Sequence, residues 1–211
     1  MEKCGFGKGF VGNFSQGTIP DQDFVRLYGD STFVIGEYGF EDVTIGGLTA
    51  KHQELALVNH TYWFSDGSAA GLLGLAYPFM TDTENSTRQY DPVFTSMWKQ
   101  NLTRPMFTMA LSRDVTTVGK GEKAKESYLA FGGVPPNVDY DDSSWARTPI
   151  RPLKQLGNWW WVDPKQEGLY VIAPEGFVYD KRGSAEPFIN TTEIPMLIDA
   201  GSTLTYLPAG E

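Results

Sequence analysis

One carboxylate stands out in the 211-residue sequence because its neighbours are apolar or small. Asp199 interrupts an apolar stretch, residues 196–208, which reads MLIDAGSTLTYLP. An acidic side chain inside an apolar strand is costly unless it is paired or functional, and buried carboxylates are candidates for acid–base chemistry. Gly201 lets the backbone approach closely, and Ser202 supplies a hydroxyl that can hydrogen-bond the carboxylate. The alternative is an Asp in a surface turn with an Asx hydrogen bond.

Other residues of chemically versatile types have simpler interpretations. The two histidines, His52 and His60, lie among polar residues and are expected on the surface, so neither is predicted to ligate a metal. Met97 and Trp98 fall on one face of an expected helix, where a core role is favoured over a ligand site. Three adjacent tryptophans, residues 159–161, form either an aromatic binding platform or the two faces of a strand.

The elements that must position Asp199 are predicted to be strands. The chain has 23 Gly, 13 Pro and 14% aromatic residues, with apolar and β-branched residues in short runs, so we expect an all-β fold with few helices. Residues 5–22 and 114–126 are interpreted as loops, and 91–100 as the best helix candidate, ended by Pro105. The expected strands are 24–28 and 33–38, joined as a hairpin through 29–31, then 42–45 before a Gly46–Gly47 turn, 54–58, 71–76 as a buried run, 107–111 and 128–133.

Charge and sequons restrict the partners and the compartment. The net charge is −9 with no basic cluster, so nucleic acid is not an expected partner; the charge serves solubility or adaptation to acidic surroundings. Five N-x-S/T sequons predict a glycoprotein that is extracellular or at the cell surface, although Cys4 is the only cysteine. No apolar run is long enough for a transmembrane segment. The sequons begin at Asn13, Asn59, Asn85, Asn101 and Asn190.

Several motifs in order resemble the pepsin-like aspartic peptidases (peptidase family A1), particularly fungal secreted members. The Asp199–Ser202 run resembles the second catalytic loop of that family. Residues 27–30, LYGD, resemble its flap, the hairpin that closes over bound peptide. Residues 36–47 resemble the strand pair after the flap, 70–78 the apolar segment beneath the first catalytic loop, and 107–112 with 128–133 the strands where the two lobes join.

The resemblance implies a fold and an activity. The fold is the bilobal acid protease fold, here incomplete: residues 1–105 are most of the N-lobe with the flap, and 106–211 are the interlobe strands and the first part of the C-lobe. The activity is aspartic-type endopeptidase, a hydrolase that cleaves peptides or proteins with two Asp residues and needs neither cofactor nor metal. The full-length enzyme is expected to be a monomer. Its catalytic residue here is Asp199, and its substrate-binding residues are Tyr28, Gly29, Asp30, Gly201, Ser202 and Thr203.

The sequence also departs from the family pattern. No Asp-Thr-Gly loop precedes Tyr28, so we expect an internal fragment that carries only the second catalytic Asp and is inactive alone. Cys4 matches the later member of a small disulfide loop without its partner. Ala200 stands where the family has Thr or Ser, whose loss leaves a buried backbone group unsatisfied, and Ser31 stands where many flaps have Gly. The alternatives are a non-catalytic pepsin-like homologue that binds peptide or protein, and an unrelated β-sandwich binding domain.

Overall fold

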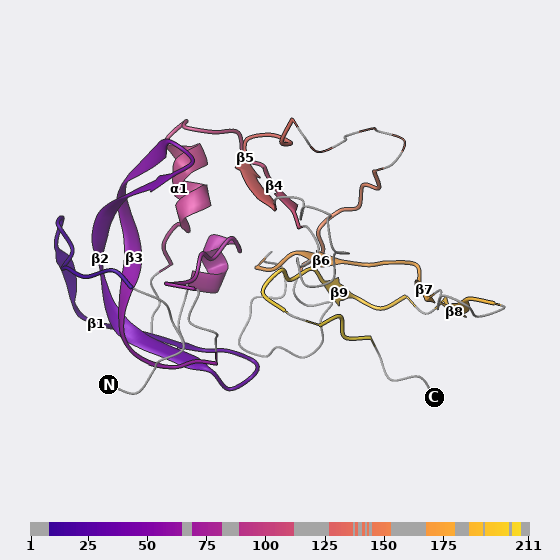
Figure 1. The fold of residues 1–211 in the computed structure, drawn as a ribbon, viewed down its shortest axis with the longest axis horizontal. Coiled ribbons are helices and arrows are strands. Elements are labelled where there is room, and N and C mark those ends of the chain that lie inside the picture. Colours follow the sequence, from indigo (N-terminus) through magenta and orange to yellow (C-terminus); the bar gives the residue numbers. More distant parts are fainter. Residues whose placement is uncertain are drawn as a thin grey trace, which may run out of the picture. The chain divides into compact units, whose positions relative to one another are not determined.

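Strands make up most of the regular structure, which confirms the expectation of an all-β fold (Figure 1). The chain divides into two units, Met1–Trp145 and Ala146–Glu211, and each is described by itself. The lobe boundary expected near residue 105 stays a prediction. The computed structural model describes residues 9–64, 69–81, 89–111, 127–136, 138, 141, 143, 145–152, 168–179, 186–191, 193–202 and 204–207.

The first unit is built on a three-stranded antiparallel sheet of long strands. These are β1 (Thr18–Leu27), β2 (Phe33–Ile45) and β3 (Leu48–Tyr62), in the order β1-β2-β3. Along β2, Val34 and Tyr38 are buried, so alternate residues of the strand face the interior. Figure 1 shows the sheet as a curled ribbon at the N-terminal end of the colour scale. The flap motif therefore stands on a sheet with one well-packed face.

Two turns close this sheet, and both lie where the sequence predicts them. The first hairpin pairs Phe24 with Gly36 and Leu27 with Phe33, as expected for strands 24–28 and 33–38. The second turn, Gly46–Gly47, has φ values of 56° and 83°. Positive φ at both central residues is the requirement of the tight hairpin turn whose twist matches the strands. Beyond this turn β3 contains the whole of the predicted strand 54–58 and extends it at both ends.

A short helix supplies the core of the first unit. Helix α1 (Val93–Lys99) begins after Pro92 and buries Val93, Phe94 and Met97, which agrees with the predicted apolar face. Met97 is fully buried and packs with Val93 and Ala50 of β3. The ring of Phe94 contacts two further strands, β4 (Phe107–Ala110) and β5 (Tyr128–Phe131), which pair antiparallel. The helix therefore connects the large sheet to the small one.

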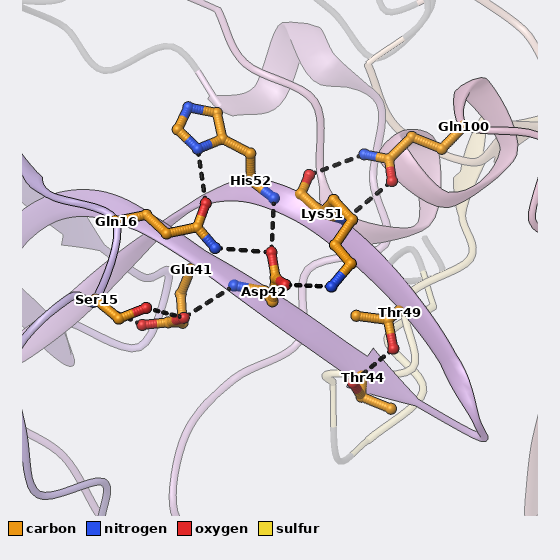
Figure 2. A network of polar contacts seen from close by, with 9 residues as sticks. All are labelled: Ser15, Gln16, Glu41, Asp42, Thr44, Thr49, Lys51, His52 and Gln100. Atoms are coloured by element: carbon orange, nitrogen blue, oxygen red, sulfur yellow. Dashed lines mark hydrogen bonds and ion pairs between the residues drawn. The ribbon is translucent and has the colours of Figure 1, made fainter.

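A polar network surrounds Asp42 near the β2–β3 turn (Figure 2). Asp42 forms an ion pair with Lys51, and its Oδ1 accepts hydrogen bonds from Gln16 Nε2 at 2.7 Å and the His52 amide at 3.1 Å. The Lys51 bond, followed by those from Gln16 and His52, lowers the pKa of Asp42 from 3.8 to about 2. Gln100 exchanges two 2.9 Å bonds with the Lys51 backbone. The network thus joins the segment before β1, the β2–β3 hairpin and the end of α1.

The second unit has short strand pairs. β6 (Val171–Ile172) pairs with β9 (Met196–Leu197), and β7 (Phe177–Tyr179) pairs with β8 (Phe188–Asn190), both antiparallel. Val171 is its one fully buried hydrophobic residue among those described. The apolar stretch 194–207 is therefore a strand only at β9, and Asp199 comes two residues after that strand ends.

Three predictions from the sequence are wrong in detail. β1 begins at Thr18 rather than after residue 22. The strand contains a bulge between Thr18 and Asp23, where Asp21 adopts a φ of 58°, so polar residues typical of a loop are part of the strand. Residues 71–76 are not a strand in the structure, and Leu72 and Leu73 are 54% and 45% exposed, because apolar composition alone does not place a run in a sheet. Trp98 is exposed rather than core, because it lies on the outer side of α1 beside Lys99.

Other predictions lie outside the described residues or concern the surface. Cys4, the loop 114–126, the tryptophans 159–161, the sequon at Asn85 and the residues Thr203 and Pro208 are outside what the structure describes. His52 and His60 are exposed, as expected. His52 stacks on Phe40 with ring centroids 4.2 Å apart. In the described part of the chain, no helix is both long and apolar enough to span a membrane.

Candidate active site

Asp199 lies in a tight turn whose conformation its own side chain stabilises. Its Oδ1 accepts a hydrogen bond from the Gly201 amide at 2.8 Å, and its Oδ2 accepts one from Ser202 Oγ at 2.7 Å. The Ser202 amide also points back to the Asp199 carbonyl at 3.4 Å. A residue with a side chain at position 201 would crowd Asp199, since a Cβ there would lie 3.1 Å from Oδ1. Gly201 and Ser202 therefore fix the direction of the carboxylate, as the sequence pattern predicts.

The surroundings of Asp199 differ from the buried strand that the sequence favoured. Asp199, Ala200, Gly201 and Ser202 are all exposed, so the turn has the Asx geometry that was the alternative interpretation. The expected penalty at Ala200, an unsatisfied buried backbone group, does not arise at an exposed position. The strand directly before the turn is β9, which has two residues. A strand of that length is too short to enclose a carboxylate.

A pocket of about 590 Å³ adjoins the Asp199 turn within the second unit. Its wall is apolar apart from Asp199, Ser202 and Thr205; the apolar lining comes from Phe177, Ile194, Pro195, Met196, Leu197, Ile198, Leu204, Tyr206 and Leu207. An ionised carboxylate on an apolar wall can orient a water or accept a proton from it. The same carboxylate cannot serve as proton donor in that step, so this turn supplies one half of an acid–base pair.

The flap motif forms a closed turn in the first unit. The Tyr28 amide donates to the Thr32 carbonyl at 2.8 Å, and the Ser31 amide donates to the Tyr28 carbonyl at 3.0 Å. Asp30 Oδ1 accepts bonds from the Thr32 hydroxyl at 2.7 Å and the Thr32 amide at 2.9 Å. These two bonds lower the pKa of Asp30 below its ordinary value. Ser31 has φ 69°, the left-handed conformation in which Gly is usual, so a Ser here forms the turn at a cost in strain.

Tyr28 is held against an aromatic partner that the sequence did not indicate. Its ring meets that of Trp63 edge to face, with centroids 5.1 Å apart. Partial burial raises the pKa of the Tyr28 hydroxyl, so it is a neutral hydrogen-bonding group over the whole physiological range. Trp63 follows the end of β3, and no local spacing links it to Tyr28. Thr32, in contrast, was detectable, because Asp followed two residues later by Thr is typical of an Asx-type turn.

The predicted site residues therefore fall into two groups. Tyr28, Gly29 and Asp30 lie together at the turn between β1 and β2, in the first unit. Asp199, Gly201 and Ser202 lie together after β9, in the second unit, and Thr203 is outside the described residues. That both groups face one cleft stays a prediction. No group of three or more potential metal ligands occurs in the described part of the chain.

Comparison with known proteins places these motifs in one family. The model of the family described as eukaryotic aspartyl protease matches residues 18–211, which include the flap turn and the Asp199 turn. The match covers nearly all of the chain, so it does not depend on a single motif.

Individual relatives that are aspartic proteases also match most of the chain. A probable aspartic-type endopeptidase of Aspergillus fumigatus is 30% identical over 212 residues, which is 99% of this chain and 45% of that protein. Aspartic proteinase MKC7 of Saccharomyces cerevisiae is 25% identical over 88% of this chain and 30% of its own length. Secreted aspartyl protease 1 of Malassezia globosa is 26% identical over 89% of this chain and 37% of its own length. The chain spans less than half of each of these relatives.

Proposed function

The chain belongs to the eukaryotic aspartyl protease family, and from this premise we propose that the protein carrying it is an aspartic-type endopeptidase with Asp199 as one of two catalytic carboxylates. The observation that supports this role is the geometry of the turn. Both Asp199 oxygens accept a hydrogen bond, from the Gly201 amide and the Ser202 hydroxyl, so the carboxylate is held in one orientation at the edge of an apolar pocket. A fixed carboxylate is what acid–base catalysis needs.

The proposed chemistry is hydrolysis by activated water. Two carboxylates a few ångströms apart cannot both ionise cheaply, so they share one proton. The ionised member accepts a proton from water, and the resulting hydroxide adds to the scissile carbonyl carbon. The protonated member hydrogen-bonds the carbonyl oxygen and stabilises the charge that develops there. Asp199 is one member, and the other comes from a part of the protein outside this chain. The reaction needs no covalent enzyme intermediate and no metal.

The flap turn is proposed to cover the substrate. Tyr28 is a neutral hydrogen-bond donor held by Trp63, and Asp30 is fixed by Thr32. The residues proposed to contact the bound peptide are Tyr28, Gly29 and Asp30 of the flap turn, and Gly201, Ser202 and Thr203. Apolar residues around the scissile bond suit the lining of the Asp199 pocket. The full-length enzyme is proposed to act as a monomer on proteins or peptides. The net charge of −9 on this 211-residue chain does not favour nucleic acid as a partner.

We further propose that the protein works in the secretory pathway, outside the cell or at its surface. The support is the set of five sequons together with relatives that include a secreted aspartyl protease. Four described carboxylates have lowered pKa values, because each accepts hydrogen bonds: Asp30, Glu41, Asp42 and Asp141. They keep their charges into acidic solution, which suits an enzyme that works there.

The alternative function is a non-catalytic homologue that binds peptide or protein. Ala200 favours it, because the hydroxyl usual at that position in the family is absent and cannot link the two catalytic loops. A binder would keep the flap turn and the apolar pocket, since both contact peptide, while losing the hydrogen bonds that set the acid–base pair.

Cleavage and binding measured together separate the two functions. We expect a protein that contains this chain and a first-lobe Asp-Thr-Gly loop to cleave denatured protein at acidic pH. Asp199→Asn should lower kcat by about 10²–10⁴-fold, the range of acid–base catalysis, while a fluorescent apolar peptide still binds. If the unchanged protein bound the peptide but cleaved nothing, the result would contradict the proposed peptidase function and support the non-catalytic peptide-binding function. If Ala200→Thr then restored cleavage, the loss would be assigned to that position.

A further inference from the structure

A strip of aromatic rings lies on the outer face of the β2–β3 hairpin. The strip consists of Phe33, His60, Tyr62 and Phe64. The centroid of the Phe33 ring lies 6.0 Å from that of His60 and 6.0 Å from that of Tyr62. The Phe33 and Tyr62 rings stack with an angle of 22° between their planes. The centroids of the Tyr62 and Phe64 rings lie 4.9 Å apart. Tyr62 is 51% exposed and Phe64 71%. A contiguous exposed apolar surface marks a candidate interaction site.

The register of the two strands defines the face on which the strip lies. Phe33 pairs with Tyr62 and Ile35 with His60, and paired residues point to the same side of a sheet. Val34, the residue between Phe33 and Ile35, is 1% exposed and points into the interior. The aromatic strip therefore occupies the opposite, solvent side of the hairpin.

A β-bulge places Asn59 at the edge of this strip. Ile35 pairs with His60 and Gly36 with Val58, so Asn59 is the extra residue without a partner on β2. Its side chain is exposed. Asn59 is also the acceptor of an N-x-T sequon whose middle residue, His60, belongs to the aromatic strip. An attachment point for sugar and a surface that needs covering are thus adjacent in the chain.

We propose that Asn59 carries an N-linked glycan whose first N-acetylglucosamine packs over the aromatic strip. The proposal rests on the secretory route proposed above. In the transfer, Asn59 Nδ2 forms a bond to the anomeric carbon of an oligosaccharide carried on a lipid pyrophosphate. The anomeric carbon–oxygen bond breaks, the pyrophosphate leaves with the electron pair, and Nδ2 releases one proton. The glycan reaches the chain before folding, and Thr61 Oγ then donates to the Phe33 carbonyl at 2.9 Å in the folded hairpin.

The chemistry of the two surfaces is complementary. Aromatic faces carry partial negative charge, and the C–H groups along one side of a pyranose ring carry partial positive charge. A sugar linked to Asn59 begins one residue away from His60 and can extend toward Phe33 and Tyr62, which belong to the same pair of strands. The exposed Asn101 sequon lies in the same unit, just after the end of α1 and next to Gln100, which bonds the Lys51 backbone at the other end of β3 from His60 and Tyr62. Asn101 is therefore the reference site.

The test is made on the full chain secreted behind an added leader from a eukaryotic host, so that its natural compartment does not affect the result. Peptide mass spectrometry after enzymatic release in heavy-oxygen water reports occupancy at each Asn. On a separate, still glycosylated portion of the protein, each glycan is trimmed to its first N-acetylglucosamine, whose acetyl group is ¹³C-labelled. The resonances of the acetyl methyl groups are then recorded. Asn59→Gln assigns one resonance and Asn101→Gln another.

We expect Asn59 to be occupied and its acetyl methyl to be shifted upfield by the aromatic rings, relative to the methyl at Asn101. Tyr62→Ser, which keeps the sequon, should return that methyl toward the Asn101 position. An empty Asn59 beside an occupied Asn101 would overturn the proposal, as would a methyl that lies at the reference position or ignores Tyr62→Ser. A chain with no glycan at any sequon would overturn it as well. None of these outcomes bears on the catalytic role of Asp199, which the cleavage assay tests separately.

Discussion

The flap turn and the Asp199 turn use the same local device in different surroundings. In each, an Asp accepts a hydroxyl bond of 2.7 Å and an amide bond of 2.8–2.9 Å from residues two or three positions ahead. At the flap, the donor Thr32 is 1% exposed and immediately precedes the 13-residue strand β2. After β9, the donor Ser202 is exposed and the preceding strand has two residues.

This difference separates what a short motif sets from what packing must add. A four-residue motif is enough to orient a carboxylate, because the hydrogen bonds close within the turn. Both carboxylates, Asp30 and Asp199, are exposed, so it is burial of the hydroxyl donor that differs. Such burial depends on long strands and a filled core, which the first unit has around Met97 and the described part of the second unit has only at Val171. The proposed acid–base role of Asp199 therefore needs further protein around it.

The largest expected difference in stability between the two units comes from a substitution in the core of the first unit. Met97→Ala removes a fully buried side chain from the contact of α1 with β3, and should lower the free energy of unfolding of this unit by about 2–5 kcal/mol. Hydrogen exchange should then accelerate in β2 and β3, while the amides of β9 keep their rates. Met106→Ala, at a 41% exposed position, is the matched control. Equal losses for the two variants would contradict a core centred on Met97.

A smaller loss of stability is expected when the contact between β1 and the 3₁₀ helix η1 (Pro78–Thr81) is removed. Arg26 Nη2 donates to the carbonyls of Met80 and Thr81, at 3.1 Å each, in η1. Arg26→Met should cost about 1.5–3 kcal/mol, the usual contribution of hydrogen bonds to a charged group. Urea unfolding followed by tryptophan fluorescence measures the change. The exposed Arg104→Met should change little, and a similar loss there would show that charge rather than these bonds is responsible.

Deleting the matching hydroxyls compares the two turns directly. Thr32→Val and Ser202→Ala each remove one hydroxyl bond of 2.7 Å to an Asp. We expect the buried Thr32→Val to cost about 1 kcal/mol and the exposed Ser202→Ala to change stability by less than about 0.5 kcal/mol. Thermal unfolding of both variants is the measurement. A larger loss for Ser202→Ala would mean that the Asp199 turn is packed more tightly than its exposure indicates.

The smallest effect concerns pH and the network around Asp42. Its folded pKa of about 2 lies below the ordinary 3.8, so its stabilising contribution is complete above about pH 4 and is lost as the pH falls toward 2. Asp42→Asn should therefore lower the thermal midpoint at pH 5, and the gap to the unchanged chain should close near pH 2. A gap that is constant with pH would contradict the assignment to the Asp42 charge.

Much of the fold was predictable because local rules decide it. The flap hairpin, the Gly46–Gly47 turn and the apolar face of α1 follow from alternation, turn residues and helical spacing. The start of β1 was missed because Asp21 and Asp23 look like loop residues and a bulge conceals the register. The run 71–76 was misjudged because apolar composition does not guarantee a ladder partner.

The local hydrogen bonds of the Asp199 turn were predictable from the sequence, but the environment of the turn was not. Asp199, Gly201 and Ser202 adopt the mutual hydrogen bonds that their spacing suggests. Burial of Asp199 was not predictable, since it depends on contacts with residues far along the chain. The Tyr28–Trp63 contact was missed for the same reason: 35 positions separate the two rings, and only the fold of β2 and β3 brings them together.

The central claim is that Asp199 works as one of a pair, and peptidase assays of two proteins test it most directly. The 211-residue chain and a longer protein that adds a first-lobe Asp-Thr-Gly loop are assayed on denatured protein at acidic pH, each beside its Asp199→Asn variant. We predict that the 211-residue chain cleaves no more than its variant, while the longer protein cleaves and loses that activity by about 10²–10⁴-fold on substitution. Asp199-dependent cleavage by the 211-residue chain would contradict the claim, and so would a longer protein that stays fully active with the Asp199→Asn substitution in place.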